Sequence, residues 1–277
     1  MNFISDIFEY QFLANAVTAC ILAGITCGIV GSYIVARRMV FLCGGITHAS
    51  FGGLGIAFWA GFSPILGALT FATISSLGIE YASRNTKIRE DSAIGVMWGI
   101  GMALGTLFMT LRPGYTSGDL SAFLFGNIVT VTTNDVIALA TLAAVLLIGS
   151  ILWLKPVMYT AFDRDFARAA GCKTEVISYT MSIITAITIV LAIRVMGIVL
   201  LISLMTMPVI IANIISKDYR LITLCASIIA AASAVSGVAL SYYMEVPSGP
   251  AIIFILTLLL LTAKLLSLPI KRLLDKR

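Results

Sequence analysis

The feature that most constrains the fold of this chain is a succession of apolar runs. A helix of about twenty apolar residues spans the roughly 30 Å hydrocarbon core of a bilayer. Such runs cover residues 11–35, 40–61, 63–83, 91–111, 135–154, 175–195, 196–215, 220–242 and 249–268. With 60% hydrophobic and only 11% charged residues, the chain has more apolar surface than one soluble core can bury. We therefore predict an all-α, polytopic membrane helix bundle of about nine spans.

One segment leaves the span count open between eight and ten. Residues 119–134 (DLSAFLFGNIVTVTTN) are too short to span easily, and a half-helix or re-entrant segment is expected there. If this segment spans, the count becomes ten and the N-terminus changes sides. No linker or low-complexity segment interrupts the chain, which favours a single transmembrane domain over residues 1–277. The N-terminus lacks a basic region and a small-residue cleavage site, so the first apolar run is expected to be retained.

The lysines and arginines predict the orientation of the bundle. With alternating spans, all of them except Arg112 and Arg194 fall on the side of Arg37 and Arg38. Basic residues in short loops are kept on the cytoplasmic side of a membrane. We therefore predict an external N-terminus and a cytoplasmic C-terminus.

The only histidine of the chain, His48, lies in an apolar, glycine-rich run. Ionisable groups within a membrane are rare and usually line a pathway. The alternative is a structural histidine that only hydrogen-bonds a neighbouring helix. Gly45, Ala49 and Gly53 recur every four residues on one face, a spacing that lets a transmembrane helix approach its neighbour closely.

Further glycines and one proline mark other helix features. Glycines four apart predict close helix contacts. These pairs are Gly24 with Gly28, Gly95 with Gly99, and Gly101 with Gly105. Pro208 is expected to break the seventh run, because proline removes a backbone donor and kinks a helix. Either a gate or a simple bend would account for such a kink.

The connection over residues 155–174 differs from the other loops. Phe162, Phe166 and Ala169 recur about one helical turn apart, and Gly171 is placed to end the turn. The charged positions between them are Asp163, Arg164, Asp165 and Arg168. A short helix over 162–171 with an aromatic face suits docking into a groove on a partner protein. An interfacial helix lying on lipid is the alternative, but its aspartates would face anionic headgroups.

On the opposite side, two turn-rich segments carry single acidic residues. Asp119 lies in RPGYTSGDL (112–120) and Glu245 in SYYMEVPSGPA (241–251). These segments are interpreted either as a docking site for a soluble binding protein or as solvated turns.

The sequence lacks the signatures of membrane enzymes. It has no histidine pair for a metallopeptidase, no aspartate pair within a span, and no glycine-rich phosphate loop followed by lysine. A protein of this kind is most simply a conduit that takes its energy from elsewhere. We predict a transport subunit rather than an enzyme, with no nucleic-acid partner.

Six segments, in order between about residues 20 and 265, carry a family resemblance. They are Cys43–Ala49 (CGGITHA), Arg89–Gly95 (REDSAIG), Leu124–Asn127 (LFGN), Asp163–Gly171 (DRDFARAAG), Gly197–Ala212 and Leu240–Gly249 (LSYYMEVPSG). Together they resemble the membrane permeases of ABC-type importers for zinc, manganese and iron. The resemblance implies a homodimer in a prokaryotic inner (plasma) membrane. It also implies two ATP-hydrolysing subunits at the cytoplasmic face, an external metal-binding protein, and no permanently bound cofactor.

The resemblance implies a role for His48 and shows two departures. His48 falls on the family's histidine, whereas Gly44 stands where the family usually has aspartate. Two copies of His48 would meet in a central path, with Thr47 and Cys43 as weaker partners of the metal. Imidazole suits zinc, whereas manganese prefers oxygen ligands, so zinc is the predicted cargo. Manganese, iron or a metal chelate remain alternatives. The second departure, Arg164 in place of a proline, is expected to matter little.

Two alternatives come from other functional classes. An ion-coupled secondary transporter would need titrating groups within its spans, and Glu80, Asp91 and Asp135 all lie at predicted span ends. A membrane-embedded enzyme would need a nucleophile or an acid/base pair, which His48 alone does not supply.

Overall fold

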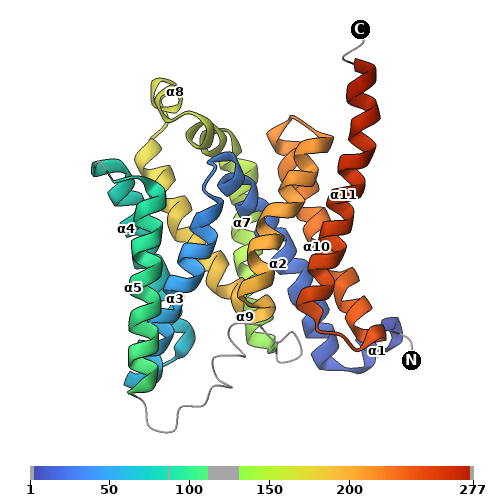
Figure 1. The fold of residues 1–277 in the computed structure, drawn as a ribbon, viewed down its shortest axis with the longest axis horizontal. Coiled ribbons are helices and arrows are strands. Elements are labelled where there is room, and N and C mark those ends of the chain that lie inside the picture. Colours follow the sequence, from blue (N-terminus) through green and yellow to red (C-terminus); the bar gives the residue numbers. More distant parts are fainter. Residues whose placement is uncertain (1–2, 87, 112–130, 275–277) are drawn as a thin grey trace.

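The computed structural model describes residues 3–86, 88–111 and 131–274, and helices are the only regular elements in these ranges. The helices are α1 Phe3–Glu9, α2 Gln11–Ala36, α3 Val40–Ala60, α4 Pro64–Asn85, α5 Glu90–Thr110, α7 Thr133–Phe162, α8 Arg164–Ala169, α9 Thr174–Ile215, α10 Tyr219–Met244 and α11 Ser248–Leu274 (Figure 1). The predicted all-α bundle is thereby confirmed. The half-helix expected near 119–134 falls almost entirely outside the described residues.

Helix α9 accounts for the number of spans. Eight described helices are long and apolar enough to cross a membrane. The 42 residues of α9 are about twice what one crossing needs. Its helix is interrupted at Gly197, where φ is 76° and ψ is 170°, a conformation that favours glycine. Both ends of α9 lie at the end of the bundle that carries α8 (Figure 1), so the chain reverses at Gly197. The described chain therefore crosses the bundle nine times, within the predicted range.

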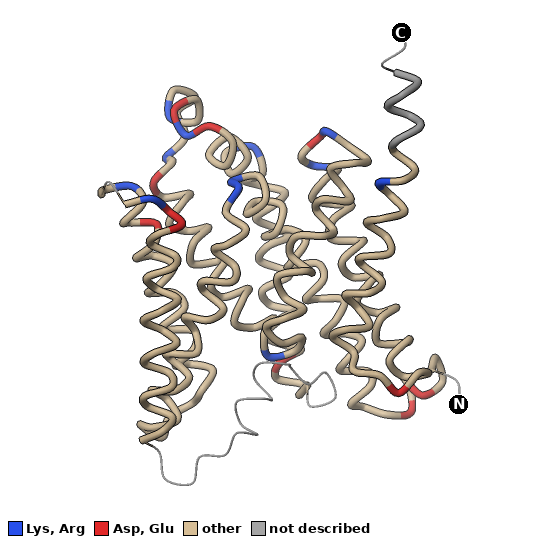
Figure 2. The backbone as a smooth tube through the Cα atoms, viewed as in Figure 1, with Lys and Arg blue, Asp and Glu red and all other residues tan. Residues whose placement is uncertain are grey.

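The charged residues distinguish the two ends of the bundle. The end that carries α8, here called the basic end, holds nearly all described lysines and arginines (Figure 2). The opposite end, here called the far end, contains α1 and the reversal at Gly197 (Figure 1). There the Arg194 guanidinium donates to the Asp135 carboxylate at 2.8 Å, tying the α9 reversal to the first turn of α7. The distribution agrees with the charge bias predicted from the sequence.

Glycines bring α3 into close contact with α4 and α5. A Cβ atom on Gly53 would lie 2.0 Å from the carbonyl oxygen of Gly67 in α4. One on Gly55 would lie 2.5 Å from the carbonyl oxygen of Gly105 in α5. Neither position has room for a larger residue, so the predicted close packing of this helix is confirmed.

The other glycine pairs differ in whether they make the predicted helix contacts. Gly24 and Gly28 pack α2 on the backbone of α10, and Gly101 packs α5 on the backbone of Ala49. A Cβ atom on Gly95 or Gly99 would meet no atom within 4 Å in the described chain. The contact predicted for Gly95 and Gly99 is therefore not made by any of the described residues.

The expected break at Pro208 is not where the helix is interrupted. Pro208 is buried within the second leg of α9, and the non-helical backbone angles of α9 occur at Gly197. Proline still removes the hydrogen bond to the carbonyl one turn earlier. The second leg nevertheless continues as a helix to Ile215.

Candidate metal path and coupling helix

His48 lies midway along α3 and stacks on Trp98 of α5. Their ring centroids are 4.3 Å apart with an interplanar angle of 8°. The Nδ1 atom of His48 and the Oγ1 atom of Thr47 are both buried, and neither has a hydrogen-bond partner among the described residues. Buried polar atoms are nearly always paired in folded proteins. The hydroxyl groups of Ser75, Thr185 and Ser233 are also buried without a partner among the described residues, whereas His48 alone of this group has a side chain that commonly binds metals.

Gly44 and Cys43 lie one turn earlier on α3 and have different surroundings. A Cβ atom on Gly44 would lie 3.5 Å from Cδ1 of Ile202 and 3.8 Å from Cζ3 of Trp98, which are ordinary contact distances. The thiol of Cys43 is fully buried and donates to the Met205 sulfur at 3.6 Å. Cys43 is thus engaged with α9, while the face around Gly44 has room for a small side chain.

The described residues contain no cluster of three or more histidine, cysteine or acidic side chains that could hold a metal. The His48 ring is only partly buried, and Trp98 is 39% exposed. Gly95 and Gly99, on the same helix as Trp98, are exposed as well. We call the surface formed by His48, Trp98, Gly95 and Gly99 the α3/α5 face. Nothing in the described chain covers it.

The short helix predicted over 162–171 is present as α8, Arg164–Ala169. The Asp163 carboxylate accepts hydrogen bonds from the backbone N–H groups of Asp165 and Phe166, both at 2.9 Å, and so caps the helix. Gly171 follows the helix with φ of 81°, which ends it as predicted. Arg168 and Asp165 are both exposed and form a long ion pair of 3.7 Å.

The aromatic side chains of this connection point outward. Phe162 is 65% exposed and Phe166 is 55% exposed, whereas Ala167 is fully buried. The sequence pattern grouped Ala169 with the phenylalanines, and it is exposed too. Ala167 is therefore the one fully buried residue of α8, and the pattern missed it. The ring of Phe166 meets the Tyr159 ring edge-on at 5.3 Å, which holds the aromatic face in place.

A buried charge cluster connects α8 with the membrane helices. Glu80 of α4 is 1% exposed and accepts from Arg37 at 3.0 Å, from Arg84 at 2.8 Å and from Arg164 at 3.2 Å. Arg37 also donates to Glu90 at 3.2 Å. Sequence reasoning identified Glu80 only as a residue near a span end. The spacing of Glu80 and Arg84 by four residues was the local signal of a pair, but the other partners come from distant segments.

Arg164 brings α8 into this cluster. It is the first residue of α8, and it also lies 3.7 Å from Glu90. Burial lowers the pKa of the Arg164 guanidinium, and repulsion from Arg37 lowers it further. The expectation that an arginine here matters little overlooked these contacts. Arg164 thus links α8 by ion pairs to Glu80 of α4 and to Glu90 of α5.

The two candidate residues for docking an external protein have unequal support. Glu245 is exposed at the far end and takes a left-handed conformation, with φ of 55°, after α10. The Ser241 hydroxyl donates to the Val246 carbonyl at 2.5 Å and steadies this turn. Asp119 lies outside the described residues. Of these two residues, the structure therefore describes only Glu245.

The sequence model of the ABC 3 transport family matches residues 9–267. The chain belongs to this family. It is 33% identical to an uncharacterized membrane protein of Synechocystis over 95% of this chain and 92% of that protein. It is 32% identical to the manganese transport system membrane protein MntC of Halalkalibacterium halodurans over 91% of this chain and 86% of that protein.

A solved structure supports the same assignment. PsaBC from Streptococcus pneumoniae, in complex with Fab, superposes with a TM-score of 0.83 and 27% sequence identity. The match covers 94% of each chain. The permease fold and the family predicted from the sequence motifs are confirmed for this ABC 3 protein.

Proposed function

We propose that this chain is the permease subunit of an ATP-driven importer for a divalent transition metal, with zinc as the favoured cargo. The observation that carries the proposal is the pair of buried, unpaired polar atoms at Thr47 and His48. Metal transport is also what the names of the relatives from Halalkalibacterium halodurans and Chlamydia pneumoniae describe. A metal ion at His48 would satisfy the free Nδ1 atom.

The metal path runs between two copies of the chain. The α3/α5 face carries His48, and the unoccupied surface of Gly95 and Gly99 can accept a helix of a second copy. Two facing copies of His48 would offer two neutral imidazoles to one ion. This small number of ligands suits transport, because the four-ligand closure of structural zinc sites would retain the ion.

The chemistry of the path favours zinc over manganese. Imidazole is a good ligand for zinc, whereas manganese prefers carboxylate and water oxygens. Gly44 supplies no carboxylate one turn before His48, and Cys43 is turned toward Met205. Manganese is the second candidate, because relatives of this chain carry names for manganese transport.

The two ends of the bundle have separate partners in this proposal. The basic end faces the cytoplasm and receives two ATPase subunits on the exposed aromatic face of α8. The far end faces outward and receives a metal-binding protein near Glu245. A secondary transporter is disfavoured because Glu80, a buried acid in the described spans, is neutralised by three arginines and is not free to carry a coupling ion.

Uptake of radioactive zinc and manganese by reconstituted vesicles tests this function. The vesicles contain the permease, its ATPase and its binding protein, and the variants are His48→Ala and Gly44→Asp. Replacing His48 should reduce zinc uptake on the order of tenfold or more, because a metal ligand is lost. Gly44→Asp should raise manganese uptake relative to zinc, since its Cβ atom fits without a clash.

Complex yield and ATP dependence serve as controls in the same vesicles. Undiminished zinc uptake by His48→Ala in an intact complex would exclude the proposed role of this residue. Uptake driven by an ion gradient without ATP would instead support the secondary transporter.

A further inference from the structure

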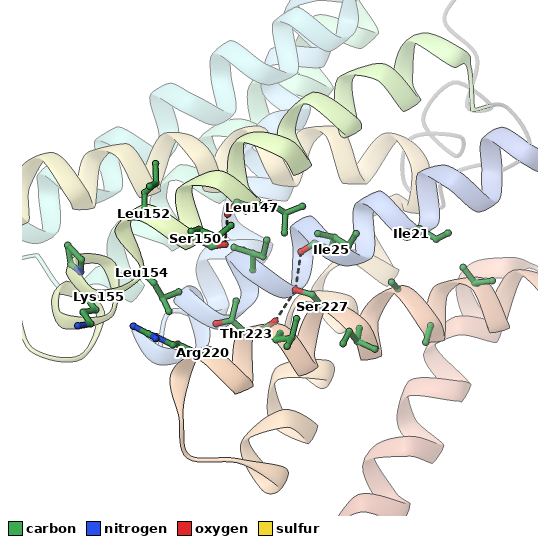
Figure 3. A pocket seen from close by; sticks show the side chains of 18 residues that line it. Ile21, Ile25, Leu147, Ser150, Leu152, Leu154, Lys155, Arg220, Thr223 and Ser227 are labelled. Atoms are coloured by element: carbon green, nitrogen blue, oxygen red, sulfur yellow. Dashed lines mark hydrogen bonds between the residues drawn. The ribbon is translucent and has the colours of Figure 1, made fainter.

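An apolar groove lies between α7 and α10 on a part of the molecule separate from the α3/α5 face. Helix α2 forms its floor, and its volume is about 1080 Å³. Figure 3 shows Lys155 of α7 and Arg220 of α10 at one end of the groove and Ile21 of α2 toward the other. The cations belong to the basic end of the bundle, so the groove runs from that end into the apolar span.

The helix sequences explain why this space exists. Gly24 and Gly28 hold α2 tightly against α10. Helix α7 instead packs on α2 and α9, and its backbone leaves helical geometry at Trp153, where φ is −118° and ψ is 15°. Pro156 follows one turn later and cannot donate a hydrogen bond to the Leu152 carbonyl. This kink separates the two walls of the groove near the basic end.

The sides of the groove are apolar and face outward. Ile151 is 81% exposed, and Leu224 and Ile228 are 56% and 58% exposed. The hydroxyl groups along the lining already donate to backbone carbonyls within the protein. They belong to Ser150, Thr223 and Ser227. Along its length the groove therefore offers hydrocarbon contacts and no spare polar group.

The charged end of the groove has the opposite character. Lys155 and Arg220 are exposed, and no acidic residue lines the groove. Among the described residues, neither cation has an acidic partner within 4.0 Å. The nearby Asp218 carboxylate caps its own helix by accepting from the Arg220 N–H at 2.9 Å. The Arg37 cluster shows the contrast, since its arginines are matched by Glu80 and Glu90.

We propose that this groove binds one anionic phospholipid of the surrounding membrane. The headgroup phosphate lies between Lys155 and Arg220, and an acyl chain lies along α2 between α7 and α10. The assignment follows from charge complementarity and from the position of the two cations relative to the membrane surface. Two unpaired cations sit where the basic end meets the membrane surface, and they continue into an apolar groove open to the hydrocarbon. Basic pockets of this kind between transmembrane helices bind anionic headgroups.

The lipid would bridge two helices beside the coupling helix. Arg220 follows Tyr219, whose ring meets Phe162 edge-on with 6.0 Å between centroids. Phe162 is the last residue of α7 and directly precedes the cap of α8. A phosphate bound by both Lys155 and Arg220 would thus hold α7 and α10 together next to the surface that receives the ATPase.

Fluorescence quenching by brominated lipids tests the proposal without metal or ATP. The chain has three tryptophans, so the full chain carrying Trp59→Phe, Trp98→Phe, Trp153→Phe and Ile25→Trp reports from a single tryptophan on the groove floor. Ile25 lines the groove and is half-buried, whereas Trp153 is 60% exposed outside the groove lining and would be quenched by any surrounding lipid. In vesicles, competition between brominated phosphatidylglycerol and brominated phosphatidylcholine gives their relative affinity at this site. We expect phosphatidylglycerol to be favoured on the order of fivefold for each cation, and less at high salt.

Three variants in this background separate the groove from general surface charge. Lys155→Gln with Arg220→Gln should bring the preference close to one. Ala232→Phe should reduce quenching by both lipids, because Ala232 lines the groove. Lys217→Gln is the matched control, since Lys217 lies at the same end but outside the groove lining, and it should keep the preference.

Three results would overturn the proposal. They are equal affinity for the two lipids before the charges are removed, an equal loss in the Lys217→Gln control, and a tryptophan at position 25 that neither lipid quenches. The last result would mean that a second copy or another protein covers the groove. Because the readout does not involve His48, its failure would leave the proposed transport function untouched.

Discussion

Replacing Glu80 by glutamine is expected to destabilise the permease more than any other single removal of charge at the basic end. Glutamine keeps the shape of the side chain but removes the negative charge that faces Arg37, Arg84 and Arg164. The side chains of Glu80 and Arg37 are only 2% and 6% exposed, so water replaces little of the lost interaction. Glu90, with 35% exposure, would be left to balance the arginines.

The expected size follows from this burial. Removing one partner of a buried ion pair costs about 3–5 kcal/mol. Arg164 is 29% exposed and retains access to water, so the lower part of this range, about 3 kcal/mol, is expected. For a chain of this size, that corresponds to a fall in melting temperature of roughly 6–12 °C.

Thermal unfolding of the detergent-purified protein measures this change. Glu175→Gln is the matched control, because Glu175 pairs with Arg84 at 3.5 Å but is 77% exposed. Its effect should stay below about 1 kcal/mol. A melting temperature of Glu80→Gln equal to that of wild type would refute the reasoning, as would an equally large fall in the Glu175→Gln control.

Three further predictions concern other parts of the molecule. Phe166→Asp should abolish co-purification of the ATPase. Phe62→Asp, at an exposed aromatic residue in another loop, should not. Unchanged ATPase recovery with Phe166→Asp would contradict docking on α8. Glu245→Gln should weaken docking of the binding protein and reduce the salt dependence of that docking, since exposed charges are screened over about 8 Å at physiological ionic strength. A wild-type docking affinity that does not vary with salt would argue against this contact. Gly53→Ala should lower the free energy of unfolding by about 1–3 kcal/mol, because its Cβ atom would collide with the α4 backbone. Gly149→Ala, whose Cβ atom meets no neighbour, should be neutral or stabilising. Equal stability of the two variants in thermal unfolding would rule out the proposed steric cause.

The amino-acid sequence by itself determined the class of the fold and the family. A span needs about twenty apolar residues whatever its neighbours are, so the length of each run is a local property. The boundary between the two legs of α9 could be predicted for the same reason, and Gly197 lies beside it. Asp163 and Gly171 could be assigned to the ends of α8, because capping depends on residues a few positions apart.

Only the tertiary structure decided which side chains meet. Two of the three partners of Glu80, Arg37 and Arg164, come from other segments of the chain, and no periodicity within one helix records such contacts. The α8 pattern could not tell which residue faces inward, because a six-residue helix has too few turns to define an apolar stripe, and Ala167 took that position. The groove at Lys155 likewise depends on two separate features of the packing, the kink of α7 and the close approach of α2 to α10. Sequence patterns report what each segment needs to bury, whereas the choice of partner depends on how all the helices pack together.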